Sequence, residues 1–447
     1  MSNLIASSRM TAVVGTGVSG LSTARFLRDK NVPFVLFDTR ENPPAQALIA
    51  REFPGVHCQF GVWDEELLQS ADEIILSPGL PLSMPAIVAA RESGVSVIGD
   101  VELFVRHAKA PIVAITGSNG KSTVTTLVGE MAKAAGMKVA VGGNLGTPVL
   151  DLLAEDMQLY VLELSSFQLE TVTKLGAEVA CILNVSADHL DRYAGMPAYH
   201  AAKQRVYYGA RHVVVNRNDP LTRPPLADAV GRSSFAGDAE FKNMGLREQA
   251  GESWLCDGLT PLIKASDLKL PGRHNIDNAL AALAIGKAAG IPIEVMLAVL
   301  VSFRGLAHRC EWVADIADVS YYNDSKGTNV GATLAAINGL ANTHGKLVVI
   351  LGGEAKDQVF TALLPALKSQ ARGCVLIGKD AELIAALLEG EVNYQYANSM
   401  VDAVAKAKLQ AERGDTVLLS PACASFDMFD HYQARGDAFC QAVRGLQ

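Results

Sequence analysis

One short stretch of this chain combines the residue types that hold the phosphates of a nucleotide. An apolar segment leads into a glycine-rich turn, and the turn ends in Lys121, Ser122 and Thr123 at the start of a predicted helix. Backbone N–H groups beside Gly117 and Gly120 can point at phosphate oxygens, and the helix N-terminus adds partial positive charge. Lys121 can neutralise the β- and γ-phosphates, and a hydroxyl of Ser122 or Thr123 can bind Mg²⁺. We therefore predict that the chain binds a nucleoside triphosphate.

The glycine-rich turn departs from the usual phosphate-binding pattern. That pattern has a glycine five residues before the Gly-Lys pair, and this chain has Ile115 there. The turn is therefore a shortened variant of the pattern, and fewer families of nucleotide-binding proteins have this variant. A turn that is merely rich in glycine is disfavoured, because strand, turn, lysine, hydroxyl and helix follow in the order that phosphate binding needs.

Polar side chains follow three further apolar segments of the predicted central sheet. Glu163 ends one strand, Asn144 follows another, and Asp188 and His189 lie in a polar cluster after a third. Because the carboxyl ends of parallel strands meet at one edge of a sheet, we expect these groups near the phosphates. Glu163 is a candidate for Mg²⁺, and His189 for a metal or substrate; an ordinary strand-end acid and a structural histidine are the alternatives. Asn275 is either a ligand or the N-cap of the next helix.

The N-terminal segment carries a second nucleotide-like pattern. Gly15-x-Gly17-x-x-Gly20 follows the first predicted strand, and the second strand ends in Asp38. This arrangement is typical of a dinucleotide site, in which the acid binds a ribose. However, the segment has about half the length of a complete dinucleotide fold. It fits a mononucleotide or a UDP group, and nicotinamide binding is the less favoured alternative.

Composition excludes several classes of protein. The 447 residues are 49% hydrophobic and 19% charged, so the chain can bury large cores. A formal net charge of −8 argues against nucleic acid as a partner. The seven cysteines are scattered, which fits a reducing cytoplasm. No signal peptide is expected, and the longest apolar region is interrupted by charged residues and proline, so we expect no membrane span.

Repeated strand, polar loop and helix units predict an α/β protein with three domains. The expected domains are a Rossmann-like domain over residues 1–100, a P-loop ATPase-like domain with a mostly parallel sheet over 101–306, and a second Rossmann-like domain over 307–447. Ligands should bind at the carboxyl edges of these sheets.

Seven strings of the sequence occur in the order seen in Mur ligases, and the chain resembles that family over essentially its whole length. They start at Thr116, Gly142, Glu163, Asp188, Gly272, His308 and Asn323. The resemblance implies cytoplasmic, ATP-dependent amide-bond synthesis through an acyl phosphate, in peptidoglycan precursor formation. The strings 163–169 and 420–425 favour the family member that adds D-glutamate to UDP-N-acetylmuramoyl-L-alanine.

The resemblance also implies a role for individual residues. ATP would contact Gly117, Ser118, Asn119, Gly120, Lys121, Ser122, Thr123, Asn278, Arg309, Asp324 and Lys326. The UDP-muramoyl substrate would contact Gly17, Val18, Asp38, Thr39, Arg40, Ser77, Gly79 and Asn144. D-Glutamate would contact Thr328, Lys356, Ser425 and Phe426. Two Mg²⁺ ions would be held with the help of Ser122, Glu163, His189 and Lys203, and the residues expected to matter most for catalysis are Lys121, Glu163, His189 and Lys203.

Lys203 matches the lysine that the family carbamylates with CO₂. A carbamate turns a cation into an anion that can help to position Mg²⁺, and it requires a lysine with an appreciable neutral fraction. A solvated helix lysine is the alternative. The expected partners are small molecules, with neither nucleic acid nor membrane, and the protein is expected to be a monomer.

Three other functions stay open. The chain could be a sibling ligase with another amino acid, or a non-catalytic nucleotide-binding regulator. An enzyme similar to folylpolyglutamate synthetase is disfavoured, because it should lack the segment with Gly15 and Asp38.

Overall fold

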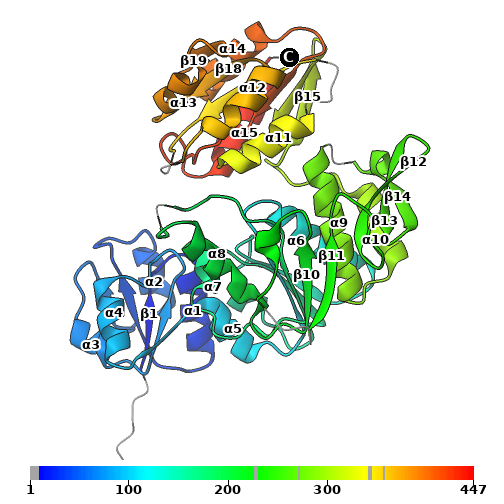
Figure 1. Ribbon diagram of the computed structural model, residues 1–447. Helices are drawn as coiled ribbons and strands as arrows, with labels where there is room; N and C mark the ends of the chain where they lie inside the picture. Colours follow the sequence, from blue (N-terminus) through cyan, green and yellow to red (C-terminus); the bar gives the residue numbers. More distant parts are fainter. Residues whose placement is uncertain are drawn as a thin grey trace, which may run out of the picture.

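A computed structural model describes residues 10–190, 192–225, 230–269, 272–340, 345–355 and 358–446. Three sheets covered by helices form three α/β domains, and the C-terminal one stands above the other two (Figure 1). This confirms the three-domain fold class predicted from the sequence. Among the described residues, no helix has both the length and the apolar character needed to cross a membrane.

The N-terminal domain is built on five parallel strands in the order β3-β2-β1-β4-β5. Its strands are β1 (Thr11–Val14), β2 (Phe34–Asp38), β3 (Cys58–Phe60), β4 (Glu73–Leu76) and β5 (Ser96–Ile98). Its helices are α1 (Val18–Asp29), α2 (Gln46–Glu52), α3 (Glu65–Gln69), α4 (Pro85–Glu92) and α5 (Asp100–His107). The central strands β1 and β4 are apolar and almost wholly buried, as expected for strands covered by helices on both faces.

The central domain has a nine-stranded sheet in the order β14-β13-β12-β11-β10-β9-β6-β8-β7. Its strands are β6 (Ile112–Thr116), β7 (Val139–Gly143), β8 (Leu159–Glu163), β9 (Val179–Ile182), β10 (His212–Asn216), β11 (Gly231–Phe235), β12 (Met244–Gln249), β13 (Glu252–Asp257) and β14 (Thr260–Lys264). Its helices are α6 (Lys121–Ala134), α7 (Ser166–Leu169), α8 (Met196–Gln204), α9 (Arg273–Ala288) and α10 (Ile293–Ser302). Short 3₁₀ turns are η1 (Val149–Leu152), η2 (Arg205–Tyr207), η3 (Pro220–Thr222) and η4 (Ala265–Asp267).

Strands β12, β13 and β14 form an antiparallel end of the central sheet that the sequence analysis did not predict. These strands mix polar and apolar residues and expose much of their length, so they lack the apolar runs that revealed the parallel strands. Ala250 and Gly251 join β12 to β13 with φ values of 53° and 80°. Two consecutive positive φ values are typical of the tight turns that connect hairpins.

The C-terminal domain has a six-stranded sheet in the order β15-β16-β20-β17-β18-β19. Its strands are β15 (Glu311–Ile316), β16 (Val319–Asn323), β17 (Leu347–Gly352), β18 (Ala371–Ile377), β19 (Tyr394–Tyr396) and β20 (Thr416–Leu419). Its helices are α11 (Val330–Leu340), α12 (Leu364–Gln370), α13 (Ala381–Leu388), α14 (Met400–Gln410) and α15 (Tyr432–Arg444), with a 3₁₀ turn η5 (Thr361–Leu363). A Rossmann-like domain, as predicted for residues 307–447, has a parallel sheet, and β15 departs from it because it pairs antiparallel with β16. Ala317 and Asp318, with φ values of 53° and 62°, close this hairpin.

The N-terminal and central domains share one cluster of buried hydrophobic side chains, in addition to a cluster that each has of its own. A single cluster of buried side chains runs from Val13 and Leu36 of the first sheet to Leu150 and Leu162 of the second domain. Phe104 of α5 lies edge-on to Tyr160 of β8, with ring centroids 5.0 Å apart. The C-terminal domain has two core clusters of its own.

Candidate active site

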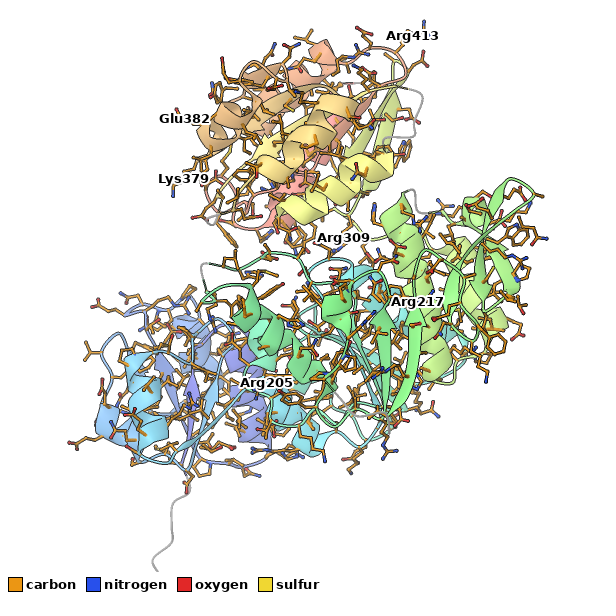
Figure 2. All side chains as sticks on the ribbon, viewed as in Figure 1. Arg205, Arg217, Arg309, Lys379, Glu382 and Arg413 are labelled. Atoms are coloured by element: carbon orange, nitrogen blue, oxygen red, sulfur yellow. The ribbon has the colours of Figure 1, made fainter. Side chains whose placement is uncertain are left out.

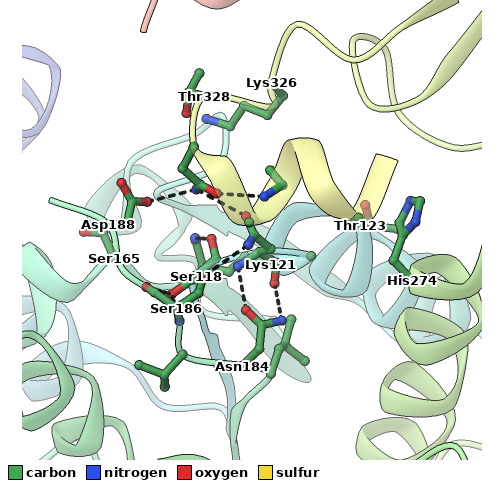
Figure 3. A pocket seen from close by; sticks show the side chains of 18 of the residues that line it. Ser118, Lys121, Thr123, Ser165, Asn184, Ser186, Asp188, His274, Lys326 and Thr328 are labelled. Atoms are coloured by element: carbon green, nitrogen blue, oxygen red, sulfur yellow. Dashed lines mark hydrogen bonds between the residues drawn. The ribbon is translucent and has the colours of Figure 1, made fainter. Parts of the chain in front are cut away.

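A cavity of about 800 Å³ lies between the central and C-terminal domains. Its floor is formed by the phosphate-binding turn between β6 and α6 and by the loops that follow β8 and β9. Its roof comes from the loops after β16 and β20 of the C-terminal domain. Figure 3 shows Lys121 and Asp188 of the central domain facing Lys326 and Thr328 of the C-terminal domain. The carboxyl edges of two sheets therefore meet at one site.

The phosphate-binding turn is hydrogen-bonded to Asn184, the second residue after β9. The Ser118 amide donates to the Asn184 carbonyl at 2.9 Å, and the Asn119 amide donates to the Asn184 side chain at 2.8 Å. Lys121 lies over the turn, where its Nζ donates to the carbonyls of Gly117 and Ser118 at 2.8 and 2.9 Å. Burial lowers the pKa of Lys121.

Glu163 lies at the end of β8 beside the first turn of α6. Ser122 donates to one carboxylate oxygen at 2.5 Å, and Asn144 donates to the other at 2.6 Å. Burial opposes ionisation of Glu163, but the charges of Lys121 and Arg309, with these two hydrogen bonds, hold its pKa below the usual value. Glu163 is therefore an anion at the base of the cavity.

Arg309 connects the C-terminal domain to the Ser122 hydroxyl, which also contacts Glu163. Its guanidinium donates to Ser122 Oγ at 2.6 Å, and Figure 2 shows Arg309 at the junction of the two domains.

The donor set fits Mg²⁺ bound together with phosphate. Within the described part of the chain, no three His, Cys, Asp or Glu side chains gather as a complete protein cage for a metal. Mg²⁺ rarely uses such a cage; it prefers one or two carboxylates, hydroxyl or phosphate oxygens, and waters. Glu163 and Ser122 can provide the carboxylate and the hydroxyl of such a set.

Lys203 is buried, with 1% of its surface exposed, so it is not the solvated helix lysine considered as the alternative. It lies on α8 and donates to the Gly117 carbonyl at 2.8 Å, and its Nζ lies 4.6 Å from the Tyr199 ring centroid. Burial, with the nearby charge of Lys121, lowers its pKa well below the ordinary lysine value. The amine therefore has a larger neutral fraction than a surface lysine.

His189 lines the cavity on the loop after β9. Its Nε2 lies 3.6 Å from the Asp188 carboxylate, and its ring lies edge-on to Phe167 with centroids 4.8 Å apart. Asn329 of the C-terminal domain donates to Asp188 at 3.3 Å and to the Asn119 side chain at 3.4 Å.

The roof of the cavity contains most of the predicted C-terminal residues. Lys326, Thr328, Ser425 and Phe426 line it, whereas Lys356 lies outside the described residues. Burial, together with Arg309 and Lys121, lowers the pKa of Lys326 to about 7. The Lys326 ammonium lies 4.2 Å from the centroid of the Tyr432 ring.

Asp324 does not line the cavity. Its buried carboxylate accepts hydrogen bonds from Ser420 at 2.7 Å and from the Cys310 amide at 3.2 Å, and burial raises its pKa to about 7. In this structure Asp324 fixes the chain that leads to Arg309, and its predicted contact with ribose stays a prediction.

Of the residues predicted to contact the UDP-muramoyl substrate, Asn144 lines this cavity. The others lie away from it, at the carboxyl edge of the N-terminal sheet. Asp38 does not offer a free carboxylate there, because it accepts from the Thr16 amide and hydroxyl at 2.9 and 2.5 Å and from the Arg40 guanidinium at 2.8 Å. Ser77 Oγ donates to the Gly15 carbonyl at 3.1 Å. Gly17, Thr39 and Gly79 lie in the same loops, and Val18 is the first residue of α1.

Three family models together match most of the chain. They are described as Mur ligase MurD-like, N-terminal domain, over residues 9–99; Mur ligase middle domain, over 115–286; and Mur ligase, glutamate ligase domain, over 308–423. The chain is also 54% identical over 446 residues to a protein of Pseudomonas aeruginosa PAO1 named UDP-N-acetylmuramoylalanine--D-glutamate ligase, covering 99% of this chain and 100% of that one. The chain belongs to the Mur ligase family. The resemblance found in the sequence is thereby confirmed.

Other relatives of this Mur ligase bear the same name. The protein of Pseudomonas fluorescens Pf0-1 is 53% identical over 446 residues, and that of Acinetobacter baylyi is 51% identical over 449 residues; each match covers 99% of this chain and 100% of the relative. Among solved structures, a pseudomurein peptide ligase type C from Methanothermus fervidus and the UDP-N-acetylmuramate-alanine ligase MurC from Thermotoga maritima each superpose with a TM-score of 0.62 at 18% identity, covering 98% of this chain and 100% of theirs. These two share the fold.

Sequence reasoning missed several residues of the Mur ligase cavity. Asn184 is the second residue after β9, so the search for polar residues at the carboxyl ends of strands that found Glu163 could have found it. Asn329 and Tyr199 reach the site only through tertiary packing, and no local signal marks them. Asn275 is not an N-cap, because α9 begins at Arg273 after Gly272, whose φ of 95° favours glycine.

Gly120 offers a matched test of the phosphate-binding turn. A Cβ there would lie 2.3 Å from the side-chain oxygen of Asn278, at a φ of +80°. We expect Gly120→Ala to weaken ADP binding at least about tenfold, measured by isothermal titration calorimetry. Gly136→Ala is the control, because Gly136 has the same φ of +80° and nothing within 4 Å of the added Cβ. Equal affinities in the two variants would contradict the prediction.

Asp38→Asn tests whether this carboxylate stabilises the N-terminal loops. Hydrogen bonds from Arg40 and Thr16 overcome the effect of burial and hold the pKa of Asp38 well below its usual range. We expect the variant to lose about 1.5–3 kcal/mol of unfolding free energy at pH 7. Because the folded pKa lies below the unfolded value of about 3.9, the difference from wild type is complete above that value and shrinks as the pH falls towards 3. Denaturant titrations across this range measure it, with exposed Asp29→Asn as control.

Proposed function

We propose that this Mur ligase joins D-glutamate to UDP-N-acetylmuramoyl-L-alanine in an ATP-dependent reaction, a cytoplasmic step of peptidoglycan precursor synthesis. The observation that carries the proposal is the single cavity in which the phosphate-binding turn and Glu163 face the predicted amino-acid residues of the C-terminal domain. The names of the relatives, at more than 50% identity over the whole chain, support D-glutamate as the amino acid.

The reaction has two steps. A carboxylate oxygen of the muramoyl-alanine attacks the γ-phosphorus of ATP, the bond to the bridging oxygen breaks, and ADP leaves. The amine of D-glutamate then attacks the acyl carbon, releases a proton, and expels inorganic phosphate as the amide forms. An acyl phosphate is exposed to hydrolysis, so a site closed between two domains protects it from water.

The residues of the cavity suit these steps. Backbone amides of the turn and Lys121 bind the β- and γ-phosphates and offset their charge as the anionic carboxylate approaches. Ser122 and Glu163 would hold Mg²⁺, with His189 near a second ion, and the metal supplies charge neutralisation between ATP and the carboxylate. Thr328 and Ser425 present hydroxyls on the opposite wall, where we place D-glutamate.

We assign a carbamate to Lys203. The neutral amine attacks CO₂, the N–C bond forms, and one proton leaves, so that the side chain becomes an anion. Burial and the nearby Lys121 favour the neutral amine that this reaction needs. Near Lys121 and the proposed metal ligands, an anion is more favourable than a second buried ammonium.

We assign UDP binding to residues 1–100, ATP binding to 101–306 and D-glutamate binding to 307–447, in a protein that acts as a monomer on small molecules. The deciding assay measures ADP release with ATP, Mg²⁺ and UDP-N-acetylmuramoyl-L-alanine, offering D-glutamate, L-alanine, L-lysine and diaminopimelate separately. ADP formed only with D-glutamate, with a product heavier by one glutamyl unit, supports the proposal. Turnover with another amino acid indicates a sibling ligase. ATP hydrolysis without an amide product indicates a nucleotide-binding regulator.

A further inference from the structure

Arg192 is a partly buried arginine that connects the N-terminal domain with the cavity. It lies three residues after His189, and its side chain is 14% exposed. Its guanidinium donates to the Pro78 carbonyl at 3.3 Å and to the Leu80 carbonyl at 3.0 Å. Both carbonyls belong to the loop after β4, the loop that contains Ser77 and Gly79 of the proposed UDP site.

The same guanidinium is held from the central domain. It donates to Glu170 at 3.1 Å, directly after α7, and lies 4.5 Å from the centroid of the Phe167 ring. Phe167 in turn lies against the His189 imidazole. The Arg192 amide also donates to the His189 carbonyl at 3.0 Å. The Arg192 guanidinium thus contacts both the loop of residues 77–80 in the N-terminal domain and the Phe167 ring, which packs against the His189 imidazole.

The loop of residues 77–80 is itself tied to the glycine-rich turn after β1. Ser77 Oγ donates to the Gly15 carbonyl, and a Cβ added to Gly15 would lie 2.8 Å from the Ser77 side chain. A displacement of residues 77–80 would therefore displace the other half of the proposed UDP site. Arg192 contacts the backbone of this unit, so the contact does not depend on which side chains bind the ligand.

We propose that Arg192 is a positioning residue that holds the loop of residues 77–80 at a fixed position relative to His189 and the phosphate-binding turn. The inference rests on the proposed function, in which UDP is anchored in one domain while the far end of the same substrate reacts in the next. A misplacement of about 1 Å at the reacting atoms costs on the order of 100-fold in rate. Arg192 therefore fixes the distance between the proposed UDP site and the atoms that react.

The test compares Arg192→Lys with Arg217→Lys in the full-length protein. Lysine keeps the charge but has no planar fork to bridge two carbonyls and a carboxylate. Arg217 is a matched control: its side chain is 18% exposed, and it donates to the Asp238 carbonyl at 2.7 Å and pairs with that residue's carboxylate at 3.0 Å. Figure 2 shows Arg217 on the side of the central domain away from the N-terminal domain.

The first measurement is hydrogen–deuterium exchange without ligands. The Leu80 amide donates to the Ser77 carbonyl at 3.0 Å and reports on the order of the loop. We expect its exchange to become at least about tenfold faster in Arg192→Lys and to stay unchanged in Arg217→Lys. Unchanged exchange in both variants overturns the proposal. This measurement does not require that the proposed reaction be correct.

The second measurement is steady-state kinetics with D-glutamate. We expect Arg192→Lys to lower kcat about 100-fold, while KM for ATP and KM for the UDP substrate each change less than about twofold. The reason is that the UDP site and the phosphate-binding turn each stay intact, and only their position relative to one another changes. Glu170→Gln should give a smaller loss of the same kind. A kcat within about twofold of wild type, or a loss matched by an equal fraction of unfolded protein, overturns the proposal. If wild-type protein forms no amide, the proposed function fails, and the exchange experiment alone decides whether Arg192 holds the loop.

Discussion

Lys203→Ala is expected to lower kcat about 1,000-fold, and acetate is expected to restore part of the lost activity. The variant removes the side chain to which we assign the carbamate, whose Nζ lies 2.8 Å from the Gly117 carbonyl. A short carboxylate can enter the space that the side chain leaves and supply the missing anion. Initial rates at increasing acetate, compared with equal concentrations of chloride, separate rescue from a salt effect.

Two controls keep this experiment decisive. Lys174→Ala removes an exposed lysine from the same domain and should leave kcat unchanged. Wild-type protein equilibrated with ¹³C-labelled CO₂ should give a carbamate signal in the NMR spectrum that is missing from Lys203→Ala. Normal turnover in the folded alanine variant would rule out the role assigned to Lys203.

Glu163→Gln is expected to lower kcat at least about 100-fold and to raise the Mg²⁺ concentration needed for half-maximal rate. Glutamine has nearly the same shape and can still accept a hydrogen bond from Ser122, so the variant removes the negative charge while disturbing packing little. That charge opposes Lys121 and Arg309 at the base of the cavity. Its loss leaves the two cations uncompensated and should weaken the proposed metal site.

Glu178→Gln is the matched control for Glu163. Glu178 lies directly before β9, at the amino edge of the same sheet, and its carboxylate lies 3.5 Å from Arg211. We expect its kinetics to match wild type at every Mg²⁺ concentration. If Glu163→Gln also shows an unchanged dependence on Mg²⁺, Glu163 does not bind the metal.

The parts of the site that could be predicted from sequence are those in which polar residues lie at the end of a strand or in the loop after it. The turn ending in Lys121 and the positions of Glu163 and His189 are local patterns, because a parallel strand carries its last residue and the loop after it to the carboxyl edge of the sheet. The pairing of Asp38 with Arg40 and Thr16 could not be foreseen, since the glycine pattern is compatible with either a ribose or an internal partner for that acid.

Contacts between domains left no such signal. Nothing in the order of residues shows that Arg192 reaches a loop more than 100 positions earlier, or that Asn329 reaches Asp188. The antiparallel strands β12–β14 were missed for a related reason: their polar faces look like loop sequence when the packing partner is unknown.

The hydrophobic core shared by the first two domains has a thermodynamic consequence. Because Val13 of β1 and Leu162 of β8 belong to one buried cluster, neither domain can unfold without exposing apolar surface of the other. The two should melt as one cooperative unit, whereas the C-terminal domain, with separate clusters, is free to melt by itself. If the proposed UDP site is correct, a uridine nucleotide bound to the N-terminal domain should therefore stabilise the central domain as well, by mass action on a common unfolding equilibrium.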